Sequence, residues 1–309
     1  MSNLEIPNTL ASSLDCASIA HPVVEKVISH ATDVGGIAVN RALPRRQRRL
    51  IGAWCFLDHI GPVSGAGMEL HVGAHPHIGL QTFTWMMQGE ILHRDSLGTE
   101  QMIRPGQVNL MTAGRGIAHT EDTPSEQSDL HAAQLWIALP KEHADTPPRF
   151  DHYPVLPRWH EQGSDITLLI GEYADKIAPT LSFSPLVALD ISVLQAGILD
   201  LNLREDFEYG ILPLQGSFTI EGESFVENEL AYLGCGRHQL QVACKATGRA
   251  LLVGGVPVRD EVVIWWNFVS HSRAAIIQAQ QDWEQGGPRF GAVSGSTQRL
   301  MPPPIPWKS

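Results

Sequence analysis

Short apolar segments separated by turn-forming residues dominate the first half of this chain. Between about residues 24 and 139, runs such as 81–87, 101–103 and 108–111 are bounded by Gly, Pro and Asp. β-Strands of globular proteins have this length and these boundaries. The 28 glycines and 21 prolines make up roughly 16% of the 309 residues, against an average near 12%. A chain interrupted this often predicts short β-strands and few helices.

The same texture returns in the second half, between about residues 166 and 256. Strand-like runs are expected at 187–194, 209–214, 217–220, 229–233 and 249–253. The sequence Met87-Gln88-Gly89 has a counterpart in Leu214-Gln215-Gly216, and Gly114-Arg115-Gly116 has one in Gly234-Cys235-Gly236-Arg237. Two β-domains with glycine turns at matched places predict an all-β fold of two tandem jelly-roll barrels.

Proline spacing and composition indicate where these domains begin and end. Prolines at 140, 147, 148, 154 and 157 alternate with polar residues, as in a linker, and the first twenty residues show no periodicity. We expect an N-terminal tail (1–22), a first barrel domain (23–145), a linker (146–164), a second barrel domain with a closing helix (165–291) and a C-terminal tail (292–309).

A helical period occurs convincingly only near the C-terminus. Ser272 is a candidate N-cap for an apolar pattern formed by Ala274, Ile277, Ala279 and Trp283. The pattern stops at Gly286-Gly287-Pro288, which is typical of a helix end. One C-terminal helix is therefore expected.

The charge balance argues against direct binding to nucleic acid or to an anionic membrane surface. With 22 Lys and Arg against 33 Asp and Glu, the formal net charge is -11, which repels phosphate groups at long range. Arg45, Arg46, Arg48 and Arg49 form a local exception, for which a solvated strand face is favoured over a targeting or anion-binding patch. No segment approaches the roughly 20 apolar residues of a membrane helix. No signal peptide is visible, so a cytoplasmic location is expected.

The cysteines predict no disulfide framework. Cys16, Cys55, Cys235 and Cys244 form no CxxC pair and are widely scattered. A chain of this length with so few cysteines is not typical of a disulfide-stabilised protein. We interpret all of them as reduced thiols.

Two short motifs combine metal-ligand side chains at strand spacing. His75-Pro76-His77 and His119-Thr120-Glu121 each place two potential ligands at positions i and i+2, which project from the same face of a strand. Two such strands side by side in a barrel bring three imidazoles and one carboxylate to one point. That donor set suits a first-row metal and leaves positions open for exogenous ligands.

Other histidines compete with this assignment. His93-Arg94-Asp95 is a rival pair in the same domain, and His71 and His131 lie near enough in sequence to take part. We rank these second. A single histidine on a strand is more often a hydrogen-bonded structural residue than a ligand.

Longer motifs resemble the signature of the pirin family, which belongs to the cupin superfamily. They read HPHIGLQTFTWMMQGE, HRDSLG and RPGQVNLMTAGRGIAHTED, and the resemblance covers roughly residues 24–291. It implies a bicupin with a single mononuclear iron site in the N-terminal barrel, whose ligands are His75, His77, His119 and Glu121. Gln81 stands where pirins commonly carry a glutamate, so the polarity around the site is expected to differ while the metal ligands are unchanged.

The second barrel is expected to have lost its site. When the offsets of the first barrel are counted from the matched glycines, the ligand positions fall on Asn202, Arg204, Gln239 and Gln241. None of these is a good metal ligand. This mapping is a hypothesis, which a metal content clearly above one per chain would contradict.

Several neighbouring residues have a structural alternative. Arg115 either orients Glu121 or a bound anion, or simply belongs to a tight Gly-Arg-Gly turn, and the two alternatives stay open. Trp85, Met86, Met87 and Met111 are interpreted as core in preference to the lining of a pocket beside the metal.

The resemblance implies a dioxygenase that cleaves quercetin or a related flavonol or aromatic substrate with O2. In this hypothesis Glu121 is both a ligand and the general base that takes the hydroxyl proton. Fe(II) is the expected metal, while Ni, Mn and Cu also suit the donor set. The alternative is a non-enzymatic, iron-dependent redox regulator that binds a transcription factor or a metabolic enzyme. A purely structural bicupin with a vestigial site ranks third.

Overall fold

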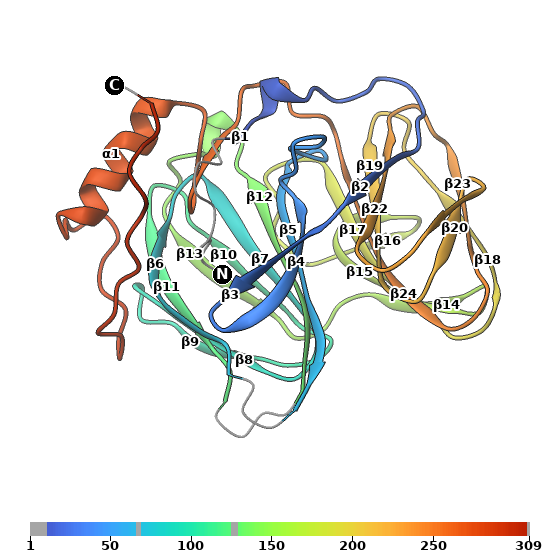
Figure 1. The fold of residues 1–309 in the computed structure, drawn as a ribbon, viewed down its shortest axis with the longest axis horizontal. Coiled ribbons are helices and arrows are strands. Elements are labelled where there is room, and N and C mark those ends of the chain that lie inside the picture. The colour runs from blue at the N-terminus through green and yellow to red at the C-terminus, as the bar shows by residue number, and fades with distance from the viewer. Residues whose placement is uncertain (1–10, 66–68, 125–128, 308–309) are drawn as a thin grey trace.

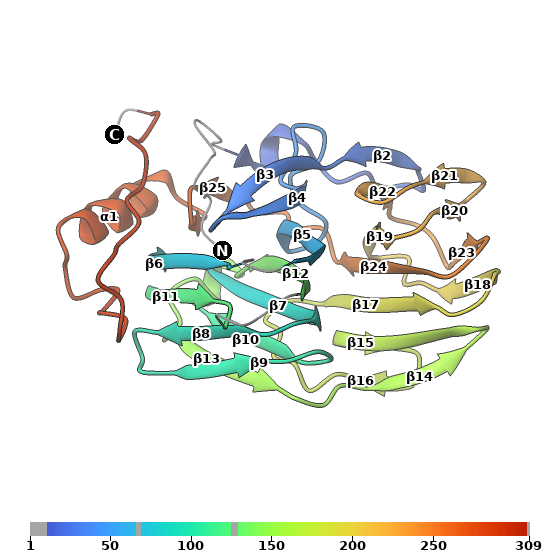
Figure 2. The ribbon, with the colours of Figure 1, turned by 60° about the horizontal axis from the view of Figure 1, so that its bottom comes forward.

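The computed structural model describes residues 11–65, 69–124 and 129–307, and β-strands dominate it. Two β-barrels lie side by side, and a single α-helix lies at the far end of the first barrel (Figure 1). Each barrel combines a large sheet with a four-stranded sheet, which Figure 2 shows from below. The predicted all-β bicupin with a C-terminal helix is therefore confirmed. The first ten residues of the predicted N-terminal tail lie outside the described residues.

The first barrel is built from eleven strands in two sheets. Its large sheet has the spatial order β13 (Arg149–Tyr153), β10 (Val108–Thr112), β7 (Leu80–Gln88), β12 (Asp129–Ala138), β5 (Trp54–Ser64), β4 (Ile37–Leu43) and β3 (His30–Val34). Its small sheet has the order β6 (His71–His77), β11 (Ile117–Asp122), β8 (Ile91–Asp95) and β9 (Glu100–Ile103). The runs expected at 81–87, 101–103 and 108–111 fall inside β7, β9 and β10.

The second barrel repeats this arrangement. Its large sheet has the order β14 (Arg158–Glu161), β15 (Ser164–Tyr173), β17 (Leu186–Val193), β24 (Gly248–Gly255), β19 (Glu208–Gln215), β22 (Glu229–Gly234) and β2 (Glu25–Ile28), and β16 (Lys176–Ile177) pairs with β15. Its small sheet has the order β18 (Gly197–Asn202), β23 (Gln239–Cys244), β20 (Phe218–Ile220) and β21 (Glu223–Phe225). Read from opposite ends, the two large sheets match strand for strand, and β7 is equivalent to β19.

The two barrels differ in where one edge strand of the large sheet comes from. In the first barrel the edge strand beside β10 is β13, which follows all the other strands of that barrel in sequence. In the second barrel the edge strand beside β22 is β2, which precedes all the other strands of both barrels in sequence. β2 lies inside the predicted first domain (23–145), yet it pairs with the second barrel. The predicted linker (146–164) contains β13 and β14, which pair with the first and second barrel respectively. The domain division as a whole stays a prediction.

A large apolar cluster joins the barrels. Phe83 and Trp85 on β7 pack in one cluster with Leu212 on β19 and Leu251 on β24. Each fully buried side chain of this size stabilises the fold by about 1.5–3 kcal/mol. Because side chains alternate along a strand, the other face of β7 points into the first barrel. Trp85, Met86, Met87 and Met111 are all buried among apolar neighbours, so their interpretation as core is confirmed.

The C-terminal segment covers the outer face of the small sheet of the first barrel. β25 (Val263–Trp265), β26 (Phe268–Ser270) and β1 (Ala11–Ser12) form a separate three-stranded sheet, and α1 (Arg273–Glu284) follows it. Two short 3-10 helices complete the fold, at Ser13–Asp15 and Lys141–His143. Apolar side chains of α1 pack with Ala74 of β6 and Ala118 of β11. Ala74 and Ala118 are thereby buried, and Figure 1 shows α1 beside β6.

The predicted helix is confirmed with small differences at its ends and on its face. Ser272 is the N-cap residue by its extended backbone, but its side chain makes no capping hydrogen bond. Gly286 follows the helix with a φ of 68°, a left-handed conformation that glycine adopts at little cost. The buried face contains Ile276, Ala279 and Trp283, whereas Ala274 of the expected pattern is exposed.

The interpretation of the arginine-rich segment as a solvated strand face was wrong. Residues 44–50 form no strand, and Arg48 is buried. Its guanidinium donates to the carbonyl of Ala17 at 3.1 Å and to Glu25 at 3.1 Å, and it stacks over the ring of Tyr232. Arg48 therefore joins the N-terminal segment to the second barrel.

Two other expectations concern the whole chain. The cysteines at 16, 55, 235 and 244 are free thiols, as predicted. Within the described part of the chain, none of the helices is long and apolar enough to span a membrane.

Candidate metal centre

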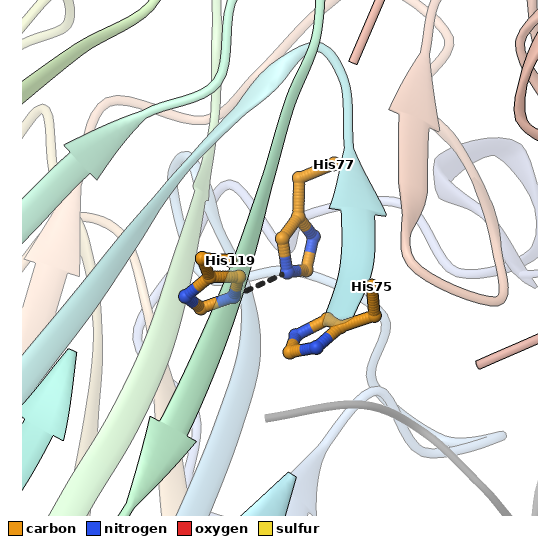
Figure 3. Close-up of side chains that lie close together, drawn as sticks. All are labelled: His75, His77 and His119. Carbon is orange, nitrogen blue, oxygen red and sulfur yellow. Dashed lines mark hydrogen bonds between the residues drawn. The ribbon is translucent and has the colours of Figure 1, made fainter. Parts of the chain in front are cut away.

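The small sheet of the first barrel brings three histidines together. β6 and β11 are antiparallel neighbours, and their register places His75 directly opposite His119. His77 lies two residues after His75 on the same face, so the three rings converge inside the barrel (Figure 3). The Nε2 atoms of His77 and His119 are 3.1 Å apart. One ligand nitrogen from each ring lies within 4.8 Å of the others, so both strands contribute to one group.

The nitrogen atoms that face away from this cluster are held by backbone carbonyls. His75 donates from Nδ1 to the carbonyl of Gly73 at 2.9 Å, and His77 donates from Nδ1 to the carbonyl of Asn267 at 2.9 Å. A carbonyl can only accept, so in a neutral ring Nδ1 carries the proton and Nε2 keeps a lone pair. The lone pairs of His75 and His77 therefore point toward the cluster.

The contact to Asn267 was not foreseen from the sequence. Asn267 lies in the turn between β25 and β26, and 190 residues separate it from His77. A backbone carbonyl leaves no signal in residue type, so no motif could have indicated it. The C-terminal segment thus orients a candidate ligand of the N-terminal barrel.

Burial keeps these imidazoles neutral. His75, His77 and His119 are fully buried, and loss of hydration lowers the pKa of each well below its usual value. Neighbouring histidines lower it further, because a second positive charge inside the cluster is repelled. Neutral imidazole is the form that binds metals.

The donor set fits a divalent cation. Within the described residues, Nε2 of His75 is buried and has no hydrogen-bond partner, which is costly unless a ligand occupies that position. Three neutral imidazole nitrogens that meet at one point suit first-row transition metals. The residues present therefore match the requirements of a mononuclear metal site.

Glu121 belongs to an overlapping set. It is buried two residues after His119 on β11, where a register irregularity separates the two residues. Its carboxylate forms a set with His93 and His119, in which the ligand atoms lie within 4.8 Å of one another. His119 is common to both sets. The structure thus gathers three of the four predicted ligands in one group and places Glu121 beside it through His119.

The rival histidines fall into different places. His93 lies on β8 against His119, with 3.2 Å between their Nδ1 atoms. His71 is exposed and pairs with Asp122 at the far end of β6. His131 lies elsewhere, where its Nε2 is 2.9 Å from Nε2 of His59. Of the rivals, only His93 reaches the candidate centre.

Arg115 and Gln81 lie away from the cluster. Arg115 is exposed and lines a surface pocket together with Ser96 and Arg289, and its backbone N–H donates to the carbonyl of Thr146. The turn interpretation accounts for this placement. Gln81 shares a face of β7 with side chains that pack between the barrels, and its Nε2 donates to Thr112 at 3.0 Å.

The second barrel offers no comparable group within the described residues. The four positions obtained by counting offsets are exposed: Asn202, Arg204, Gln239 and Gln241. The residues that face inward are one position away and apolar, with Leu201 opposite Leu240. The offset mapping was wrong in register. Five residues connect β18 to β19, whereas two connect β6 to β7, which shifts the count that gave Asn202 and Arg204.

Family models match both barrels of the chain. The model described as Pirin matches residues 36–137, and the model described as the pirin C-terminal cupin domain matches residues 188–291. The chain belongs to the pirin family. The resemblance found in its motifs is thereby confirmed.

Known relatives of this pirin cover most or all of its length. A Pseudomonas aeruginosa protein provisionally named quercetin 2,3-dioxygenase is 54% identical over 311 aligned residues, which cover 100% of this chain and 99% of the relative. A pirin-like protein of Caulobacter vibrioides is 36% identical and covers 82% of this chain and 90% of its own. A crystal structure of quercetin 2,3-dioxygenase from Acinetobacter baumannii superposes with a TM-score of 0.90 at 42% identity, covering 93% of this chain and 97% of that one.

Proposed function

We propose that this pirin is a metal-dependent dioxygenase that cleaves quercetin or a related flavonol with O2. The observation that carries the proposal is the group of buried, neutral imidazoles whose Nε2 atoms converge, with no hydrogen-bond partner for Nε2 of His75 within the described residues. The names of two similar proteins, from Pseudomonas aeruginosa and Acinetobacter baumannii, support the substrate class.

The residues that would hold the metal are His75, His77, His119 and Glu121. A divalent metal bound there, Fe(II) in this proposal, supplies Lewis acidity that lowers the pKa of a substrate hydroxyl and offers open positions for substrate and O2. The three imidazoles contribute neutral donors. Glu121 contributes the anionic one and so reduces the net charge of the filled site.

Glu121 has a second task in this proposal. A substrate hydroxyl has to lose its proton before the aromatic ring becomes reactive, and the proton needs an acceptor within hydrogen-bond reach. Glu121 is buried, so a carboxylate oxygen there is shielded from competing water. We assign to this oxygen the role of general base, which takes the hydroxyl proton.

The enclosing strands keep the reaction away from bulk water. His75, His77 and His119 have no exposed surface, and the C-terminal segment covers the outer face of β6 and β11. A dry site strengthens the attraction between charged groups inside it. The small aromatic substrate and O2 are the proposed partners.

Oxygen uptake tests the proposal. The protein is loaded anaerobically with Fe(II), quercetin is added, and oxygen consumption is followed in parallel for the wild type, His119→Ala and the control His160→Ala, which changes an exposed histidine. We expect uptake by the wild type and the control, and none above free iron for His119→Ala. If the wild type holds one metal and consumes no oxygen, the proposed reaction is wrong and the redox-regulator alternative gains weight.

A further inference from the structure

His93 and Asp95 form a hydrogen-bonded chain that ends at His119. The two residues lie on β8, where Asp95 pairs with His119 and His93 pairs with Glu121 across to β11. Nε2 of His93 lies 3.3 Å from Oδ2 of Asp95, and Nδ1 of His93 lies 3.2 Å from Nδ1 of His119. The rings of His93 and Phe150 stack with their centroids 4.5 Å apart, which holds the plane of the imidazole.

Asp95, the acceptor at the far end, sets which atom donates in each of these hydrogen bonds. Asp95 accepts the backbone N–H groups of Leu97 at 2.8 Å and Thr99 at 3.1 Å. Both N–H groups donate to Oδ1, so that Oδ2 of Asp95 is the oxygen that faces Nε2 of His93. An ionised carboxylate only accepts hydrogen bonds. Nε2 of His93 must therefore carry a proton.

When His93 is neutral, its Nδ1 carries no proton and therefore accepts a hydrogen bond. Nδ1 of His93 faces Nδ1 of His119, so His119 donates from Nδ1 and keeps the lone pair on Nε2. This is the same arrangement that the carbonyls of Gly73 and Asn267 produce in His75 and His77. The Nε2 atoms of His77 and His119, which are 3.1 Å apart and joined by the dashed line in Figure 3, then present two lone pairs to each other. A cation bound by both nitrogens makes that arrangement favourable.

We propose that His93, held by Asp95, is a positioning residue that fixes the tautomer and orientation of His119 so that its Nε2 lone pair faces the metal. This inference rests on the metal site of the proposed function and extends it to residues that are not ligands. Without an acceptor at position 93, His119 can move its proton to Nε2 and donate to His77. The metal would then have to displace that hydrogen bond.

Two variants separate this role from packing and from direct coordination. His93→Leu removes the acceptor, whereas His93→Asn places a carbonyl oxygen where Nδ1 of the ring was. Ni(II) affinity is measured by competition with a chromophoric chelator for both variants, the wild type and the control His160→Leu. We expect His93→Leu to weaken binding by about 10–100-fold and His93→Asn to restore it to within about threefold of the wild type.

Three results of this titration overturn the proposal. If His93→Leu binds Ni(II) as tightly as the wild type, position 93 has no influence on the site. If His93→Asn is as weak as His93→Leu, His93 is a ligand or a packing residue. If the wild type binds no Ni(II), the metal site itself is wrong. Binding without oxygen uptake contradicts only the dioxygenase proposal, so the two failures can be told apart.

A measurement on the wild type alone covers the case in which a variant does not fold. Zn(II) is diamagnetic, so the zinc-loaded, ¹⁵N-labelled protein gives sharp imidazole N–H signals in NMR spectra. We expect a slowly exchanging proton on Nδ1 of His119 with a through-hydrogen-bond coupling to Nδ1 of His93. If His119 carries that proton on Nε2, or if His93 carries it on Nδ1, the proposal is contradicted.

Discussion

On β6 and β11 of the first barrel, His75 lies opposite His119, whereas on β18 and β23 of the second barrel Leu201 lies opposite Leu240. The order of strands in the two small sheets is the same. The second barrel is filled by one apolar cluster that includes these leucines. The first barrel interrupts its apolar clusters with neutral, buried imidazoles.

This comparison shows that one topology serves two purposes. Burying a leucine stabilises the fold, while burying a polar ring without all its partners costs free energy. In the first barrel, a ligand bound at the centre would offset that free-energy cost. The second barrel has no such site within the described residues and contributes a strong core and an interface. We infer that stability and function are divided between the copies.

The largest expected effect comes from removing the residue shared by both ligand sets. In His119→Ala we expect the metal content to fall from one per chain to none, because Nε2 and the contact to His93 are lost together. Metal analysis of the purified protein after Ni(II) loading and gel filtration measures this. A wild-type content clearly above one per chain would break the comparison, since the second barrel would then bind metal too.

The next effect separates chemistry from binding inside the first barrel. Glu121→Gln removes the charge of the proposed base but keeps its shape, so much of the metal should remain while kcat falls by about 10²-fold or more. Quercetin-dependent oxygen uptake and metal content are measured on the same samples. Turnover at the wild-type level in this variant would show that Glu121 is not the general base.

A core truncation tests the stabilising role of the second barrel. Leu240→Ala removes a fully buried side chain, so we expect the free energy of unfolding to fall by about 2–5 kcal/mol with metal content unchanged. Gln241→Ala changes the adjacent exposed position and should have little effect. Urea denaturation compares the two. Equal stability of both variants would contradict the assignment of Leu240 to the core.

The smallest effect concerns two histidines near the contact between the barrels. His59 and His131 lie on the first barrel, and Asn228 of the second barrel lies 2.7 Å from His59. Burial, the neighbouring His59 and Arg249 lower the pKa of His131 to about 3. Because the unfolded chain binds a proton near pH 6.5 and the folded chain does not, this group leaves stability unchanged above pH 6.5 and opposes folding increasingly as the pH falls toward 3.

Replacement of His131 should therefore reduce the sensitivity of the fold to acid. Between about pH 7 and pH 5 we expect His131→Leu to lose about 2 kcal/mol less stability than the wild type. Urea denaturation at both values measures the difference, with the exposed-site variant His160→Leu as the control. An identical loss in His131→Leu and the wild type would show that His131 is also protonated in the folded state.

Much of the candidate site could be predicted because it depends on local spacing. A strand turns alternate side chains to the same side, so His75 and His77 had to share a face, as did His119 and Glu121. Turns that contain glycine and proline also marked the ends of most strands and of the terminal helix. The role of His93 was harder to predict, because its partner on β11 is set by the register between strands and not by the residues next to it.

The sequence by itself determined the class of fold, the repeated barrels and the identity of the candidate ligands, since these depend on periodicity, turn residues and motifs within short segments. Only the tertiary structure decided which contacts complete them. The carbonyl of Asn267 reaches His77 from 190 residues away, and β2 joins a barrel that begins more than a hundred residues later. Arg48 is buried against Tyr232 although its segment is rich in charge. Such contacts arise from packing between distant segments, which leaves no periodic trace along the chain.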